Sequence, residues 1–230
     1  MARWKSDDIK NYATRVTAGL VSVTLRRRAV IDFARQHKLI YFRSVSAGGQ
    51  FAPVIVGSTA SPDQVDTNFS IGTHAGYDLA LLERMGSITY EGYKSTQHRW
   101  YVLQIDLHKA NNLPFIFIGT RQQTKAYYAR VLATHRHVRY LTVDSGAARS
   151  SAFHSQYAVI ASPAELPQVY RLLNDENIDI IAANKQPFAV EIDGDTLSVI
   201  TEATRPSQQL LDKLLHYGLW LAKEADSRLA

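Results

Sequence analysis

Basic and aromatic side chains are mixed along residues 109–149, a pattern able to bind a polyanion. This stretch holds seven lysine and arginine residues and one acidic residue, Asp144. Lysine and arginine pair with phosphates, and the rings of Tyr127, Tyr128 and Tyr140 could stack on bases. The candidate anion-binding residues are Arg121, Lys125, Arg136 and Arg139. One function expected from the sequence is therefore the binding of nucleic acid or an anionic membrane surface through this region.

The same tyrosines also fit a structural interpretation. Residues Thr120–Gln123 have the spacing of a capping box, which predicts that a helix opens there. Tyr127, Tyr128 and Val131 fall on one stripe of that helix, and such a stripe normally faces the core. No RNP, KH or zinc-finger signature accompanies the basic residues. Both interpretations stay open at the level of sequence.

Carboxylate and lysine side chains over residues 91–109 are the nearest approach to a hydrolytic site. On adjacent strands, Glu91, Lys94, Asp106 and Lys109 would approximate the carboxylate-plus-lysine group of a metal-dependent nuclease. Lys94 is the third residue after Glu91, however, and this spacing puts them on opposite faces of a strand. A metal-dependent hydrolase is therefore the last of the functions we carry forward, and no catalytic residue is assigned.

The histidines form no recognised metal motif. His135 and His137 are spaced for one strand face rather than for the helical pair of zinc proteases, and a third ligand would have to be His154 or Asp144. The absence of cysteine excludes disulfides, thiolate metal sites and a cysteine nucleophile. There is also no P-loop and no GxSxG elbow. We expect no resident metal and no cofactor, and we favour a non-enzymatic function over the hydrolase alternative.

The composition is that of a folded protein. The chain has 230 residues, of which 46% are hydrophobic and 20% charged, so it can bury a sizeable core. No apolar run approaches the ~20 residues that span a bilayer, and no signal-peptide pattern is present, so we expect a cytoplasmic protein.

The charges are distributed unevenly along the chain. Residues 1–150 hold 20 lysines and arginines against 10 acids, and residues 151–230 hold 6 against 11. This asymmetry indicates an acidic partner for the first part, or contact between the two parts.

A hairpin followed by a helix is the clearest structural signal. Asp193-Gly194 is typical of a type I′ turn, which would pair Ile192 with Asp195 and Val190 with Leu197. One face of the hairpin is then apolar, as is one side of a helix after Pro206, so each can cover the other. The hairpin face comprises Phe188, Val190, Ile192, Leu197 and Val199. The helix side comprises Leu210, Leu211, Leu214, Leu215, Gly218, Leu221 and Ala222.

The remaining patterns predict an α+β protein with a mainly antiparallel sheet packed by helices. We expect an N-terminal helical arm over residues 1–38 and a single α+β domain over residues 39–230. A helix should begin at Ser162 or at Pro167 and end near residue 174. A turn or helical segment is predicted at 78–85, and a loop at 144–151. The predicted strands cover residues 39–43, 68–74, 87–93, 100–107, 113–118, 138–143 and 153–160.

The order of these segments resembles a set of bacterial proteins of unknown function. It comprises an arginine-rich helix with FARQHKLIYF, then LPFIFIG, FHSQYAVIASPAELPQVYRLL, the VEIDGDTLSVI hairpin and a long C-terminal helix. The resemblance covers roughly residues 26–225 and concerns element order and apolar pattern. Some members of the set carry transmembrane anchors that this chain lacks. The resemblance implies a cytosolic α+β module and transfers no functional residues.

The function that we predict first is a non-enzymatic binding or assembly module with a protein partner. An assembly module needs an exposed apolar patch, for which the large candidates are Trp4, Trp100 and Trp220.

Overall fold

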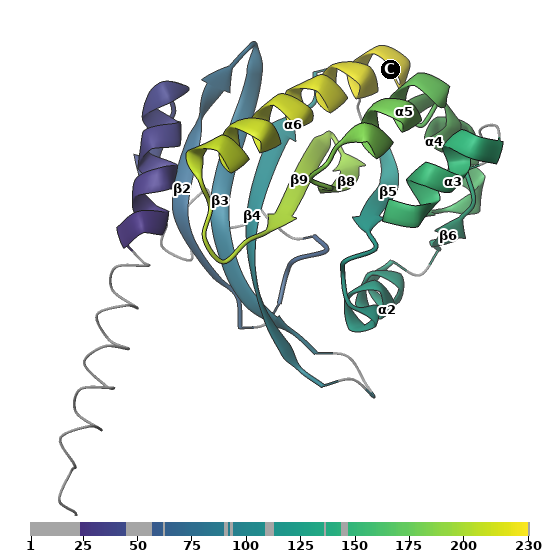
Figure 1. The fold of residues 1–230 in the computed structure, drawn as a ribbon, viewed down its shortest axis with the longest axis horizontal. Coiled ribbons are helices and arrows are strands. Elements are labelled where there is room, and N and C mark those ends of the chain that lie inside the picture. The colour runs from purple at the N-terminus through teal and green to yellow at the C-terminus, as the bar shows by residue number, and fades with distance from the viewer. Residues whose placement is uncertain are drawn as a thin grey trace, which may run out of the picture.

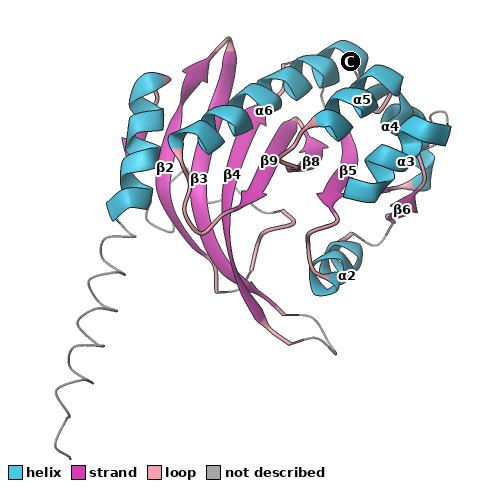
Figure 2. Ribbon diagram, viewed as in Figure 1, coloured by secondary structure: helices cyan, strands magenta, loops and turns pink. Residues whose placement is uncertain are grey.

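The computed structural model describes residues 24–44, 57–61, 63–89, 92, 94–108, 113–135, 137–143 and 147–229, with the backbone alone for 147–150 (Figures 1 and 2). Its helices are one over residues 24–36, α2 (Lys125–Thr134), α3 (Ala147–Gln156), α4 (Leu166–Leu172), α5 (Asp175–Ala183) and α6 (Gln208–Arg228), with a 3₁₀ turn, η1 (Pro163–Glu165), before α4. Its strands are β1 (Ile40–Phe42), β2 (Val65–His74), β3 (Tyr77–Ile88), β4 (Thr96–Asp106), β5 (Leu113–Thr120), β6 (Arg139–Leu141), β7 (Tyr157–Ala161), β8 (Ala189–Gly194) and β9 (Thr196–Glu202).

The described strands form a single sheet in the order β1-β2-β3-β4-β9-β8-β5-β7-β6. Every pair of neighbours is antiparallel, for example β3 with β4 and β5 with β7. The predicted α+β class with a mainly antiparallel sheet is therefore confirmed. We call the face that carries Leu103 and Val199 the helical face, and the face that carries Val102 and Ile200 the second face.

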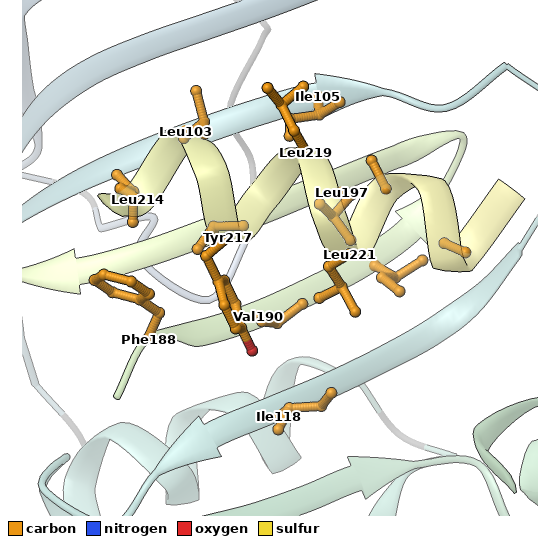
Figure 3. Close-up of a cluster of buried hydrophobic side chains, with 14 of the residues drawn as sticks. Leu103, Ile105, Ile118, Phe188, Val190, Leu197, Leu214, Tyr217, Leu219 and Leu221 are labelled. Carbon is orange, nitrogen blue, oxygen red and sulfur yellow. The ribbon is translucent and has the colours of Figure 1, made fainter. Parts of the chain in front are cut away.

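The helical face is covered by α6, which lies along the β4, β9 and β8 strands (Figures 1 and 3). Leu214 and Leu221 of α6 pack with the hairpin residues Val190 and Val199, and all four side chains have no exposed surface. Ser207 caps the helix by accepting a hydrogen bond from the Leu210 N–H. The predicted mutual cover of hairpin and helix is confirmed.

The helix over residues 24–36 and the group α3–α5 extend the helical layer on either side of α6 (Figure 1). Val30 and Phe33 are fully buried against the same core. His37, just after this helix, places its Nε2 atom 2.8 Å from the Asp212 carboxylate of α6. The described part of the predicted N-terminal arm therefore packs into the main core, and residues 1–23 lie outside the described residues.

The second face is covered at one end by α2. Tyr127 and Val131 are 1% and 2% exposed and pack against Phe117 of β5 and Ile160 of β7. The helical stripe predicted to face the core does so. The neighbouring β5 residue Ile118 points into the helical layer, so β5 is covered on both sides, as its continuous apolar run predicts.

Four element predictions were wrong. Of the strand predicted at 87–93, only Ser87 and Ile88 lie in a strand, at the end of β3, and residue 92 lies in a turn. The segment 78–85 is neither a turn nor a helix but the middle of β3, because its charged pair Glu83 and Arg84 is buried in ion pairs rather than exposed. Residues 147–156 form α3 instead of a loop followed by a strand, and Phe153 packs into the core from that helix. The capping box at 120–123 does not open α2, since Thr124 is the N-cap and accepts the Tyr127 N–H.

The hairpin turn lies one residue later than predicted. Asp193 pairs with Thr196 and Ile192 with Leu197, so the two turn residues are Gly194 and Asp195. Only Gly194 has a positive φ, of 65°, which is the pattern of a type II′ turn rather than type I′. Moving the turn by one residue changes the pairing by two positions and therefore leaves every side chain on its predicted face. The helix after β7 follows one of its two predicted starts. Ser162 caps the 3₁₀ turn η1, and α4 continues directly from it.

Gly218 lets α6 approach the sheet closely. A Cβ atom there would lie 2.9 Å from Ile105, 3.1 Å from Leu103 and 3.2 Å from Val199. Gly218→Val should lower the free energy of unfolding by about 1–3 kcal/mol through overpacking, as measured by urea denaturation. The control Gly218→Ala should change the stability less, because a gain in helix propensity of about 1 kcal/mol offsets the smaller clash of a single methyl group. Unchanged stability of the valine variant would contradict close packing at this contact.

Candidate functional site

A groove of about 600 Å³ lies on the second face over strands β1 to β4. Every described residue that lines it belongs to a strand, and no described helix covers this part of the face. Two of its apolar side chains are unusually accessible, Ile40 at 62% and Phe42 at 40% exposure. We call this feature the β1–β4 groove. Its apolar floor consists of Ile40, Phe42, Phe69, Ile71, Ala80 and Leu82.

The floor follows from the register of the strands. Ile40 pairs with Ile71, Ile71 with Ala80, and Phe42 with Phe69, so apolar side chains from three strands form adjacent rows on one face. A bulge in β2 between residues 67 and 70 gives the strand one extra residue opposite β3. The left-handed residue Asn68, with φ of 53°, lies in this bulge and hydrogen-bonds Tyr41 and Glu83.

One end of the β1–β4 groove is acidic. Asp78 and Asp106 line it together with Thr196, and Thr73 donates a hydrogen bond to Asp78. Burial raises the pKa of the Asp106 carboxyl, and the neighbouring charges of Asp195 and Asp78 raise it further. This end therefore favours hydrogen-bond donors and disfavours anions.

A buried polar cluster covers the middle of the second face. Ser58 donates its N–H to Glu191 Oε2 over 2.8 Å, and the Tyr127 hydroxyl donates to Ser58 Oγ over 2.7 Å. Gly57 lies close to this carboxylate, so a Cβ atom there would be 2.6 Å from Glu191 Oε1 and would have to displace it. The short segment 57–61 is thus held on the sheet by a carboxylate from β8 and a phenol from α2.

Arg84 makes the second attachment of this segment. Its guanidinium is fully buried, binds both carboxylate oxygens of Asp66 at 2.7 Å and donates to the Thr59 hydroxyl at 3.2 Å. A bidentate pair of this kind is strong and directional. Since all these groups satisfy one another, the cluster positions residues 57–61 and offers no open site for chemistry.

The predicted anion-binding residues are only partly brought together. Arg121 and Lys125 are exposed and line a common groove between α2, β6 and β7. Arg139 is exposed but absent from the described lining of this groove, and alternation along β6 places it on the face opposite Tyr140. Arg136 lies outside the described residues.

The other candidate residues do not converge. No group of three metal-ligating side chains occurs in the described part of the chain. Asp106 lines the β1–β4 groove, whereas Glu91 and Lys109 of the suggested nuclease group lie outside the described residues. Trp100 is 1% exposed and Trp220 is partly buried against the core, so neither supplies the expected apolar patch, and Trp4 is outside the described residues.

The β1–β4 groove itself was missed from the sequence. Ile40 and Phe42 were correctly placed on a strand, but their alternation with Tyr41 indicates only which side chains share a face. Whether that face is covered depends on helices far away in the sequence.

Comparisons with known proteins show a shared fold. No family model and no curated protein matches the chain. Among solved structures, the chain is similar to the crystal structure of the mycobacterial trehalose monomycolate transport factor A, TtfA, with a TM-score of 0.57 and 12% identity over 88% of this chain and 93% of that one. These findings agree with the predicted pattern-level resemblance to a module of unknown function. None of the described helices combines the length and hydropathy needed to cross a bilayer.

The buried Glu191 should make stability depend on pH. Burial raises its pKa above the usual value, and the hydrogen bonds from Ser58 and the charge of Arg84 only partly offset this. Stability contributed by the protonated carboxyl is present below the unfolded-state pKa and is lost as the pH rises through the raised folded-state pKa. Glu191→Gln should remove this loss, so the variant gains stability relative to the wild type between pH 4 and pH 8, as measured by urea unfolding at each pH.

The control for this prediction is Glu176→Gln, because Glu176 is an exposed glutamate on α5. It should leave the pH dependence of the wild type unchanged. Identical pH profiles for Glu191→Gln and the wild type would show that burial does not raise the Glu191 pKa.

Proposed function

We propose that this chain is a non-enzymatic binding protein whose β1–β4 groove holds an amphiphile. The apolar chain of the ligand lies on the floor, and an uncharged, hydroxyl-bearing head group lies at the acidic end. The observation that carries the proposal is the groove itself, an apolar trough that ends in two carboxylates and that no described helix covers.

An apolar chain suits the floor in size and chemistry. The volume of about 600 Å³ falls within the range of about 300–1,000 Å³ typical of small-molecule sites. Each methylene group that leaves water for this floor contributes about 0.8 kcal/mol. Ile40 and Phe42 have the most surface left to bury, so they are the contacts on which affinity should depend most.

The acidic end selects the head group. Asp78 and Asp106 accept hydrogen bonds, so they suit sugar-like hydroxyl groups, and their negative charge opposes a carboxylate or phosphate. The name of the structural neighbour concerns the transport of trehalose monomycolate, and trehalose is a hydroxyl-rich sugar. This agrees with the proposed ligand class at the level of shared fold. The cytoplasmic location, bacterial source and protein partner expected from the sequence stay predictions.

Titration with dodecyl maltoside, below its micelle-forming concentration and followed by calorimetry, tests the proposal. The protein should bind this neutral glycoside at least about tenfold more tightly than laurate, because the carboxylate head of laurate meets Asp78 and Asp106. Ile40→Asp and Phe42→Asp should each abolish most of the binding, since a charge on the floor must be desolvated.

Val65→Asp is the matched control. Val65 is 50% exposed on β2 but is not among the described residues of the groove lining, so the variant adds the same charge and should bind like the wild type. Equal loss in all three variants, or tighter binding of laurate, would overturn the proposal. A dimer that Ile40→Asp converts to monomer, with no binding of the glycoside, would assign the groove to a second copy of the chain instead.

A further inference from the structure

A second groove, of about 770 Å³, lies at the opposite end of the sheet between α2, β6, β7 and the end of α3. Its described lining contains Arg121, Lys125 and His154 and no acidic residue. We call it the α2–β7 groove. Its charge is the reverse of that of the β1–β4 groove, because the charged side chains in its described lining are basic rather than acidic.

The side chains of Arg121 and His154 are held in place by backbone carbonyl groups. Arg121 Nε donates to the His154 carbonyl oxygen over 2.6 Å, which fixes the guanidinium at the junction of β5 and α3. His154 Nε2 lies 2.9 Å from the Val143 carbonyl oxygen. Since a carbonyl only accepts, this nitrogen carries a proton and donates it to Val143. Lys125, at the start of α2, is exposed beside them.

An aromatic ring lies in the same groove. Tyr140 is 53% exposed, and its ring centroid is 5.9 Å from that of Tyr128. Tyr128 is buried and donates its hydroxyl to the Thr120 carbonyl oxygen, so it supports Tyr140 from a fixed position. A tyrosine with half of its surface accessible, backed by a second ring, is a suitable platform for a planar group.

We infer that the α2–β7 groove binds a nucleotide unit, with its phosphate on Arg121 and Lys125 and its base on Tyr140. Arginine pairs with phosphate through two parallel N–H donors, and lysine adds a mobile point charge. Stacking on a tyrosine ring is tolerant of base identity. A groove of about 770 Å³ has room for a nucleotide of a single strand or a free nucleotide, and not for a double helix. The site shares no lining residue with the β1–β4 groove and is independent of the proposed function.

Fluorescence anisotropy with a labelled single-stranded oligouridylate tests the inference, and competition by unlabelled UMP separates a free nucleotide from a strand. Binding should weaken with salt with a slope of about −0.7 for each phosphate contacted. Arg121→Gln and Lys125→Gln should each weaken binding about tenfold and reduce that slope. Tyr140→Leu should weaken binding about tenfold with the slope unchanged, because it removes stacking and no charge.

Arg171→Gln is the matched control, since Arg171 is exposed on α4 over the helical face, and it should bind like the wild type. Arg139→Gln separates a groove from a diffuse positive field, because Arg139 lies beside Tyr140 on the other face of β6. A loss with Arg139→Gln as large as with Arg121→Gln would overturn the inference. So would tighter binding to duplexes or to phosphatidylglycerol vesicles than to the single strand, or no binding at low salt.

Discussion

The contact between α6 and the β8–β9 hairpin determines which surface of the sheet is left for ligands. The hairpin presents an apolar row to the helix, and Gly218 removes the side chain that would hold the two layers apart. With α6 in place, the helix over residues 24–36 and α3–α5 complete one continuous layer on the helical face (Figure 1). Both candidate grooves consequently lie on the second face or at the edge of the sheet. The strand side chains there meet no described helix in one groove, and α2 and the end of α3 in the other.

For the β8–β9 hairpin, the sequence predicted which side chains share a face of the sheet, but not which residues of the two strands pair. The side chains Val190 and Val199 share the helical face under either turn position, because a shift of two residues preserves alternation. The burial of charged side chains in β3 was the feature that the sequence did not reveal. Residues 78–85 were predicted as a turn or helical segment, yet in β3 Arg84 meets Asp66 from the neighbouring strand and Glu83 meets Arg99. Such partners are 16 to 18 residues away, beyond the reach of local periodicity.

The two grooves differ in how far the sequence could reveal them. Arg121 and Lys125 were recognised because they lie in a stretch nearly free of acids. Both line the same groove, Arg121 from the turn after β5 and Lys125 from the start of α2. The β1–β4 groove depends on apolar residues that any buried strand would contain. Ile40 is exposed because no described helix reaches β1 on the second face, which is a property of the assembled layers. Trp100, by its size the more conspicuous candidate, lies in the core.

Net charge along the sequence also overstated the positive field of the first part of the chain. Arg84 is paired with Asp66, and both Arg26 and Arg99 contact the buried Glu83, so these three cations act mainly within the fold. A paired, buried charge contributes little to the potential that a distant ligand experiences. What distinguishes the α2–β7 groove is that its cations lie together in a lining without acids. The local grouping of Arg121 with Lys125, and not the excess of basic residues over the whole region, is therefore the physical basis on which we infer anion binding at this groove.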